Sequence, residues 1–175
     1  MQPGIPDLFV EINYSNYIFV VGTYDDSQNF KIIEKIIMPN EGINKNKFKN
    51  IDQAQEVIRK NVQAIENKLN YVFKDVTIIV DNFEYSCINI SGFKKLNGSQ
   101  VLKENISYIL NSLKLAVTEN EKEKTILHIF NSKSFLDGTR VENLPIGLFG
   151  DFYSHELTFF LINNNDLKNI KQVFN

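Results

Sequence analysis

The first part of the chain alternates between short apolar runs and polar turns. Apolar, β-branched and aromatic residues fill most of residues 8–14, 17–24 and 30–38, and polar residues separate these runs. Runs of this length, joined by such turns, predict three strands of an antiparallel meander. Pro39 has no backbone N–H, so we expect it to end the third strand, with a polar loop from residues 40–42 onward.

A helix is predicted over residues 51–69. Its apolar positions recur at steps of three and four, which places them on one stripe of a helix. They are Ile51, Ala54, Ile58, Val62, Ile65 and Leu69. Asn50 is expected to cap the first turn, and Gln53 three residues later completes a capping-box pattern. The apolar residues 75–80 predict a fourth strand.

A second group of elements is predicted after residue 84. Residues 85–93 indicate a strand, and a polar turn at residues 96–99 leads into another helix. The inward positions of this helix are expected to be Leu102, Ile106, Ile109, Leu113 and either Ala116 or Val117. The charged residues 119–124 are expected to form a solvated loop after the helix.

Three strands and a closing helix are predicted for the rest of the chain. Residues 125–130 are apolar at both alternating positions, which predicts a strand buried on both faces. Residues 134–142 predict a second strand, broken by a turn at Asp137-Gly138. A long strand follows over residues 152–162. The closing helix is expected to begin near Asn165 and to run through Leu167, Ile170 and Val173. The predicted order is β-β-β-α-β, then β-α-β-β-β-α.

Composition and charge describe an ordinary globular chain. Its 175 residues suit one large domain or two small ones. Hydrophobic residues make up 43% and charged residues 23%, which excludes disorder of the whole chain. The net charge is −2, and arginine, the residue that grips phosphates and base edges, occurs only as Arg59 and Arg140. Nucleic-acid binding is therefore not expected.

The cysteine content and the N-terminus bear on the compartment. Cys87 is the only cysteine in the sequence, so no intrachain disulfide can form, which fits a reducing compartment. Residues 1–7 carry neither the basic nor the apolar segment of a secretion signal. No stretch reaches the roughly 20 apolar residues of a membrane span. We expect a soluble, cytoplasmic protein without direct membrane insertion.

Candidate catalytic residues are few. The only histidines are His128, inside an apolar strand where a core role is expected, and His155, at a strand start where it can be exposed. Cys87 has no helper nearby in the sequence and is expected to be a small structural apolar residue. Neither the histidine nor the cysteine spacing matches a zinc site. We expect no catalytic residues and no metal site.

Two glycines, Gly147 and Gly150, have a spacing that could pass for half of a phosphate loop. The GxGxxG pattern and the Walker-type pattern are both absent. Ile146, Leu148 and Phe149 bracket the glycines, so a sharp turn or close backbone packing is the expected role.

Three stretches follow, in order, a pattern known from one protein family. The strongest is residues 126–130, continuing through 134–138 to 143–150. The second is residues 42–45, a glycine-led entry to the helix at 51–69. The third is residues 10–16 with the two strands after it. Together they resemble the bacterial cell-division protein FtsA, a divergent branch of the actin superfamily, over nearly the whole chain.

The amino-terminal stretch departs from the family at its first phosphate loop, of pattern D-x-G-T/S-x-K. The aspartate is replaced by Glu11, the glycine by Asn13, the Thr or Ser by Tyr14 and the lysine by Asn16, with Ser15 between the last two. A side chain in place of the glycine obstructs the approach of backbone N–H groups to a phosphate. Asparagine tolerates the left-handed conformation, so we expect a degenerate hairpin that survives without a ligand.

The resemblance implies a fold of the α+β or α/β class. It would be a partial actin-like, ribonuclease H-like subdomain 1A with an inserted small αβ lobe, called 1C, of the SHS2 type. Residues 1–84 would form part of 1A, residues 85–163 the 1C lobe, and residues 164–175 a helix returning to 1A. The second phosphate loop, the adenosine-binding region and the membrane-targeting helix of the family would lie beyond Asn175. The chain would then be either a fragment of a family member or a naturally short relative. No cofactor is expected in this chain, because ATP is expected only for a complete family member.

The resemblance also implies partners. In the FtsA family the 1C lobe takes part in self-association and contacts later division proteins such as FtsN. The leading hypothesis is therefore a non-catalytic adaptor, recruited to the inner face of the cell membrane at the division site. FtsZ docks mainly on the other half of the family fold, so no direct FtsZ contact is expected.

Two other hypotheses stay open. Pilus-assembly proteins of the PilM type are also actin-like, carry a comparable lobe, and bind a short pilus peptide in place of a division protein. An actin-type ATPase would require the loop at residues 11–16 to work despite Asn13 and Tyr14. It would also require a second half supplied from elsewhere.

Overall fold

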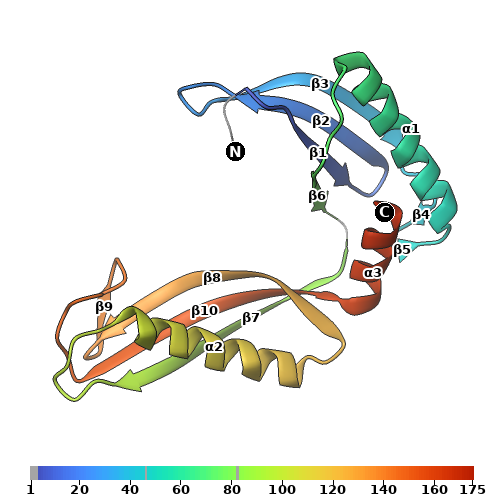
Figure 1. The fold of residues 1–175 in the computed structure, drawn as a ribbon. Coiled ribbons are helices and arrows are strands. Elements are labelled where there is room, and N and C mark those ends of the chain that lie inside the picture. Colours follow the sequence, from blue (N-terminus) through green and yellow to red (C-terminus); the bar gives the residue numbers. More distant parts are fainter. Residues whose placement is uncertain (1–3, 46, 82) are drawn as a thin grey trace. The chain divides into compact units, whose positions relative to one another are not determined.

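The computed structural model describes residues 4–45, 47–81 and 83–175, and it divides them into two compact units (Figure 1). Of the described residues, those between 4 and 84 and those from 165 to 175 form unit 1, and residues 85–164 form unit 2. Each unit has a four-stranded sheet and a long helix. The chain is therefore of the mixed α+β class, as expected.

The sheet of unit 1 contains the predicted meander. It is formed by β1 (Asp7–Ile12), β2 (Asn16–Tyr24), β3 (Phe30–Pro39) and β6 (Val76–Val80), in the order β3-β2-β1-β6. Neighbours β1, β2 and β3 are antiparallel, whereas β6 is parallel to β1. Pro39 is the last residue of β3, which confirms the expected strand end.

The first sheet buries one of its two faces. Alternate residues of β1 and β2 are fully or nearly fully buried, namely Leu8, Val10, Ile12, Tyr17, Phe19 and Val21. Helix α1 (Ile51–Leu69) lies along this sheet and buries Ala54, Ile58 and Ile65, all three on the predicted stripe (Figure 1). The core is therefore formed by every second residue of the strands and by every third or fourth residue of the helix.

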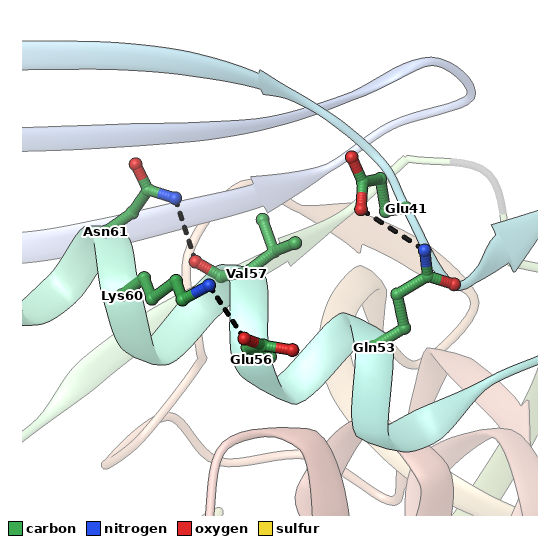
Figure 2. Close-up of polar contacts among 6 residues, drawn as sticks. All are labelled: Glu41, Gln53, Glu56, Val57, Lys60 and Asn61. Atoms are coloured by element: carbon green, nitrogen blue, oxygen red, sulfur yellow. Dashed lines mark hydrogen bonds and ion pairs between the residues drawn. The ribbon is translucent and has the colours of Figure 1, made fainter.

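Asn50 caps the N-terminus of α1 as predicted, but the prediction of a capping box is wrong. The backbone N–H of Gln53 donates to Oδ1 of Asn50 over 3.0 Å. The side chain of Gln53 does not return to the Asn50 backbone; its Nε2 donates to Oε2 of Glu41 over 3.2 Å (Figure 2). The loop before the helix thus supplies a carboxylate that competes for the Gln53 side chain.

Two small elements complete unit 1. The expected polar loop contains a short ribbon of β4 (Ile43–Asn44) and β5 (Lys47–Phe48), which the sequence did not reveal because two-residue strands have no periodicity. Helix α3 (Asn164–Val173) closes the chain and buries Ile170 and Val173, as expected.

The sheet of unit 2 is fully antiparallel. It is formed by β7 (Tyr85–Lys95), β8 (Lys124–Leu136), β9 (Thr139–Val141) and β10 (Phe152–Asn163), in the order β7-β10-β8-β9. The predicted turn at Asp137-Gly138 joins β8 to β9, with both residues at positive φ. Paired positive φ values are typical of a tight hairpin turn.

Helix α2 (Lys103–Asn120) covers one face of this sheet (Figure 1). Its Ile109, Leu113 and Val117 are buried together with Leu157 and Phe159 of β10. The helix runs to Asn120 and β8 begins at Lys124, so the expected solvated loop is shorter than predicted.

Two expectations for α2 are wrong. Leu102 is 49% exposed, because it is the extended residue that precedes the helix; Val101 is buried instead. Ala116 is exposed, and Val117 takes the inward position that the sequence left open between the two.

The prediction that residues 125–130 are buried on both faces is also wrong. Leu127 and Phe130 of β8 are exposed, at 38% and 53%. The cause is architectural, because a sheet with a helix on one face leaves its other face without a cover.

Gly92 of β7 is where α2 comes closest to the sheet. A Cβ atom at this position would lie 2.7 Å from Cγ2 of Ile109 and 3.4 Å from Cδ1 of Leu113. We expect Gly92→Ala to lower the free energy of unfolding by about 1–3 kcal/mol, because extra volume in a packed core displaces its neighbours. Urea denaturation measures this change. Ser91→Ala, at the exposed neighbouring position, is the matched control and should change it by less than about 0.5 kcal/mol. Equal midpoints for the two variants would contradict the prediction.

Candidate functional site

The β1–β2 hairpin holds the five residues, Glu11 and Asn13 to Asn16, that the resemblance places at the first phosphate loop. Oδ1 of Asn13 accepts the backbone N–H groups of Ser15 over 3.1 Å and of Asn16 over 2.8 Å. Nδ2 of Asn13 donates to Oε1 of Glu11 over 3.1 Å. The side chain of Tyr14 is 62% exposed. The structure therefore brings the five predicted loop residues together around the Asn13 side chain.

A residue that the sequence analysis did not single out, Asn40, ties this hairpin to the end of β3. Its Nδ2 donates to the carbonyls of Asn13 over 3.0 Å and of Tyr14 over 2.7 Å. Its backbone N–H donates to the carbonyl of Ser15 over 3.0 Å. Polar residues directly after a strand end were the available signal for such a tie.

The expected left-handed backbone at Asn13 is wrong, since Asn13 is not among the described residues with positive φ. The hairpin keeps its shape by side-chain hydrogen bonds instead, in the manner of an Asx turn. Two backbone N–H groups that could face an anion already have an acceptor in Asn13. An anion at this turn would have to displace that carboxamide, next to the carboxylate of Glu11.

The two histidines have exchanged their expected environments. His128 is exposed on β8, whereas His155 of β10 is 2% exposed. The alternation of β10 decides this, because its odd-numbered residues face α2. Cys87, which was expected to be a small structural apolar residue, is exposed. It lies on β7, on the side of the sheet that no helix covers.

His155 is enclosed in a small polar cluster under α2. Its Nδ1 lies 3.0 Å from the hydroxyl of Tyr153, and its neighbour across the ladder, Ser134, is also buried. Nε2 of His155 has no hydrogen-bond partner among the described residues. Burial lowers the pKa of the His155 imidazole below its ordinary value of 6.5. The site lacks a nucleophile and base in contact with solvent, so it indicates core packing.

Gly147 and Gly150 have the structural roles that the sequence predicts. Gly147 has a φ of +87°, which permits a sharp turn. A Cβ at Gly150 would lie 2.5 Å from Cδ1 of Leu136, so this position requires close packing. In the described parts of the chain, no group of three His, Cys, Asp or Glu side chains is placed to hold a metal ion.

The uncovered side of the second sheet carries a set of aromatic side chains, which we call the aromatic face. They are Tyr85, Phe93, Phe130, Phe152 and Phe160. Tyr85 is 69%, Phe93 63% and Phe130 53% exposed. Ring centroids are 6.2 Å apart for Tyr85 and Phe160, 5.5 Å for Phe130 and Phe160, and 5.2 Å for Phe93 and Phe152.

Polar contacts occupy the middle of the aromatic face. Oε1 of Glu156 accepts Nδ2 of Asn89 over 3.2 Å and lies 3.4 Å from Nζ of Lys133. Exposed aromatic side chains that gather on one face are typical of surfaces that bind proteins. The sequence did not reveal this face, because Phe130 falls in the segment 125–130 that was predicted to be buried on both faces.

The buried imidazole predicts a pH dependence of stability. The pKa of His155 is lower in the folded state than in the unfolded state, so unfolding takes up a proton below about pH 6.5. The free energy of unfolding should therefore fall by up to about 2 kcal/mol from pH 7 to pH 5 through this group. Urea denaturation at both pH values measures it. The decrease should be smaller in His155→Leu, and an identical decrease in both proteins would contradict the assignment.

Comparison with known proteins gives relatives in sequence and in structure. No family model matches the chain. The cell division protein FtsA of Buchnera aphidicola subsp. Schizaphis graminum (strain Sg) is 26% identical over 161 residues, which are 92% of this chain. The chain spans only 38% of that relative's length.

Solved structures share the fold. A PilM-PilN type IV pilus biogenesis complex contains a chain that matches with a TM-score of 0.58 and 8% identity, over 98% of this chain and 44% of that one. A Bacteroides thetaiotaomicron protein with an actin-like ATPase fold and unknown function matches at a TM-score of 0.34, too low to carry an argument. The resemblance inferred from the residues is confirmed, because the chain is similar to FtsA along nearly its whole length. Its fold matches part of a chain of the PilM-PilN complex.

Proposed function

We propose that the chain is a non-catalytic protein–protein interaction part of an FtsA-like cell-division protein. In this proposal, unit 1 corresponds to part of subdomain 1A and unit 2 to the 1C lobe. The similarity to FtsA supports the division role. Unit 2 would contribute to self-association and to the recruitment of division proteins of the FtsN type, without direct contact to FtsZ.

The aromatic face is the observation that carries the interaction role. Large apolar side chains on an uncovered sheet cost free energy in water, and a partner surface that covers them recovers it. Tyrosine and phenylalanine are enriched where proteins bind one another. The polar contacts of Glu156 would orient a partner on this face.

The same similarity to FtsA supports a location for the protein. We place the protein in the cytoplasm, at the inner face of the membrane at the division site. Among the described residues, no helix is both long and apolar enough to cross a membrane. With only two arginines in the sequence, nucleic acid is not a proposed partner.

A pilus-assembly role of the PilM type is the second candidate, favoured by the structural match to a PilM-PilN complex. The fold of unit 2 is compatible with the division role and with the pilus role. The identity of the protein that it binds therefore distinguishes the two. Binding to a short peptide of a pilus-assembly protein, and not to a division protein, would select this candidate.

We expect no nucleotide binding by the hairpin of residues 11–16, because the Asn13 carboxamide already accepts its backbone N–H groups. Titration of the chain with Mg-ATP in a calorimeter should give no detectable heat at millimolar nucleotide. Saturable heat that becomes larger in the Glu11→Gln variant would contradict this expectation. Such a result would favour the actin-type ATPase hypothesis.

We expect the double variant Tyr85→Ser/Phe130→Ser to weaken binding of an FtsN-type division protein from the same organism at least tenfold. Truncation of aromatic residues at the centre of an interface typically costs more than about 1 kcal/mol each. Fluorescence anisotropy with the purified partner measures the change. Phe149→Ser is the matched control, because Phe149 is 69% exposed, as Tyr85 is, but lies in the loop before β10. Equal losses in both variants would remove the aromatic face from the interface.

A further inference from the structure

The edge strands of the two sheets differ in how they are protected. Natural edges are blunted by short length, charges, proline or bulges. Edge strands β9 and β6 are protected by their short length, since β9 has three residues and β6 has five. Edge strand β3 carries Lys31, Glu34 and Lys35, has a register shift against β2, and ends at Pro39.

β7 has none of these protections along its first nine residues. It is 11 residues long and pairs with β10 without a register shift. Its charges, Lys94 and Lys95, stand at its end. None of the backbone–backbone bonds outside the regular ladders begins or ends on residues 85–95. The outer side of β7 is thus a regular, uncharged row of backbone donors and acceptors.

The sequence of β7 is symmetric in side-chain size about Asn89. On the aromatic face it reads large, small, polar, small, large, which are Tyr85, Cys87, Asn89, Ser91 and Phe93. On the side under α2 it reads small, large, large, small, which are Ser86, Ile88, Ile90 and Gly92. An interface around a two-fold axis needs this kind of self-complementary surface.

We propose that β7 pairs antiparallel with β7 of a second copy of this chain, around a two-fold axis at Asn89. The proposal rests on the proposed function, because it identifies the surface through which unit 2 would self-associate. Tyr85 then lies opposite Phe93 of the second copy, and Ile88 lies opposite Ile90. Aromatic and β-branched pairs of this kind stabilise antiparallel ladders.

Charge favours a second copy as the occupant. The exposed Glu84 precedes β7 directly, and Lys94 follows the symmetric segment. Extending the same register places Glu84 of one copy beside Lys94 of the other, twice in the dimer. Pairing around this axis keeps both α2 helices on one side and joins the two aromatic faces on the other.

A disulfide tests the register directly. Cys87 lies opposite Ser91 of the second copy, and opposed residues of an antiparallel pair have Cα atoms about 4.5–5.5 Å apart, within the range of a disulfide. We expect the full chain with Ser91→Cys, under mild oxidant, to form at least tenfold more reducible dimer than the wild type. In the wild type the two Cys87 residues would lie about 13 Å apart, four positions out of register.

Two controls complete the experiment. Cys87→Ser/Ser91→Cys carries a single thiol out of register, and Thr139→Cys places a second thiol on the opposite edge strand; both should remain at the wild-type level. Equal dimer in Ser91→Cys and in either control overturns the proposal.

A non-covalent test does not depend on the cysteine variant. Asn89→Lys and Asn89→Asp each place like charges at the axis, so each should shift the sedimentation profile toward monomer. An equimolar mixture of the two should restore the dimer, and a mixture that stays monomeric overturns the proposal. If both tests fail while the aromatic face still binds a division protein, the proposed function stands and only the self-pairing is lost.

Discussion

One-sided coverage of the second sheet is the constraint on which the properties of unit 2 depend. Helix α2 packs closely on β7 at Gly92, and its apolar stripe meets the odd-numbered residues of β10. The opposite side of the same strands therefore has no cover within the unit. Aromatic residues at such positions cannot be explained by the core of this unit, since they lie on its far side. Their exposure is the physical reason for proposing that unit 2 binds a partner.

In unit 1 the constraint is different: the backbone N–H groups of the β1–β2 hairpin need hydrogen-bond acceptors. A phosphate-binding turn leaves backbone N–H groups without protein acceptors, which a bound anion then satisfies. Here the Asn13 carboxamide supplies the acceptor, and Asn40 fastens the turn to β3. The turn is therefore complete without a ligand. The side chains of Asn13 and Asn40 thus hold the β1–β2 hairpin and the start of the loop after β3 together.

Much of the fold could be predicted because periodicity reports one-sided burial. The stripe from Ile51 to Leu69 and the long strand over residues 152–162 appear in the structure nearly as predicted. The errors on the strands share one cause, since periodicity does not say which face of a strand meets the core. His128 and His155 exchanged environments for this reason. The prediction of a left-handed backbone at Asn13 was wrong for another reason. Hydrogen bonds to the Asn13 side chain hold the turn without that backbone conformation.

The free edge of β7 and the aromatic face follow from the same placement of α2. A helix that covers one face of a sheet leaves the in-plane hydrogen bonds of the outermost strand open, so edge and face are presented together. Pairing along the edge uses mainly backbone groups, whereas a partner on the face uses side chains. Self-association would bring Tyr85 of one copy next to Phe93 of the other and widen the apolar surface at the centre of the pair. A partner that contacts both copies would then bind the dimer more tightly than the single chain. In this arrangement, self-association and recruitment are coupled through one strand.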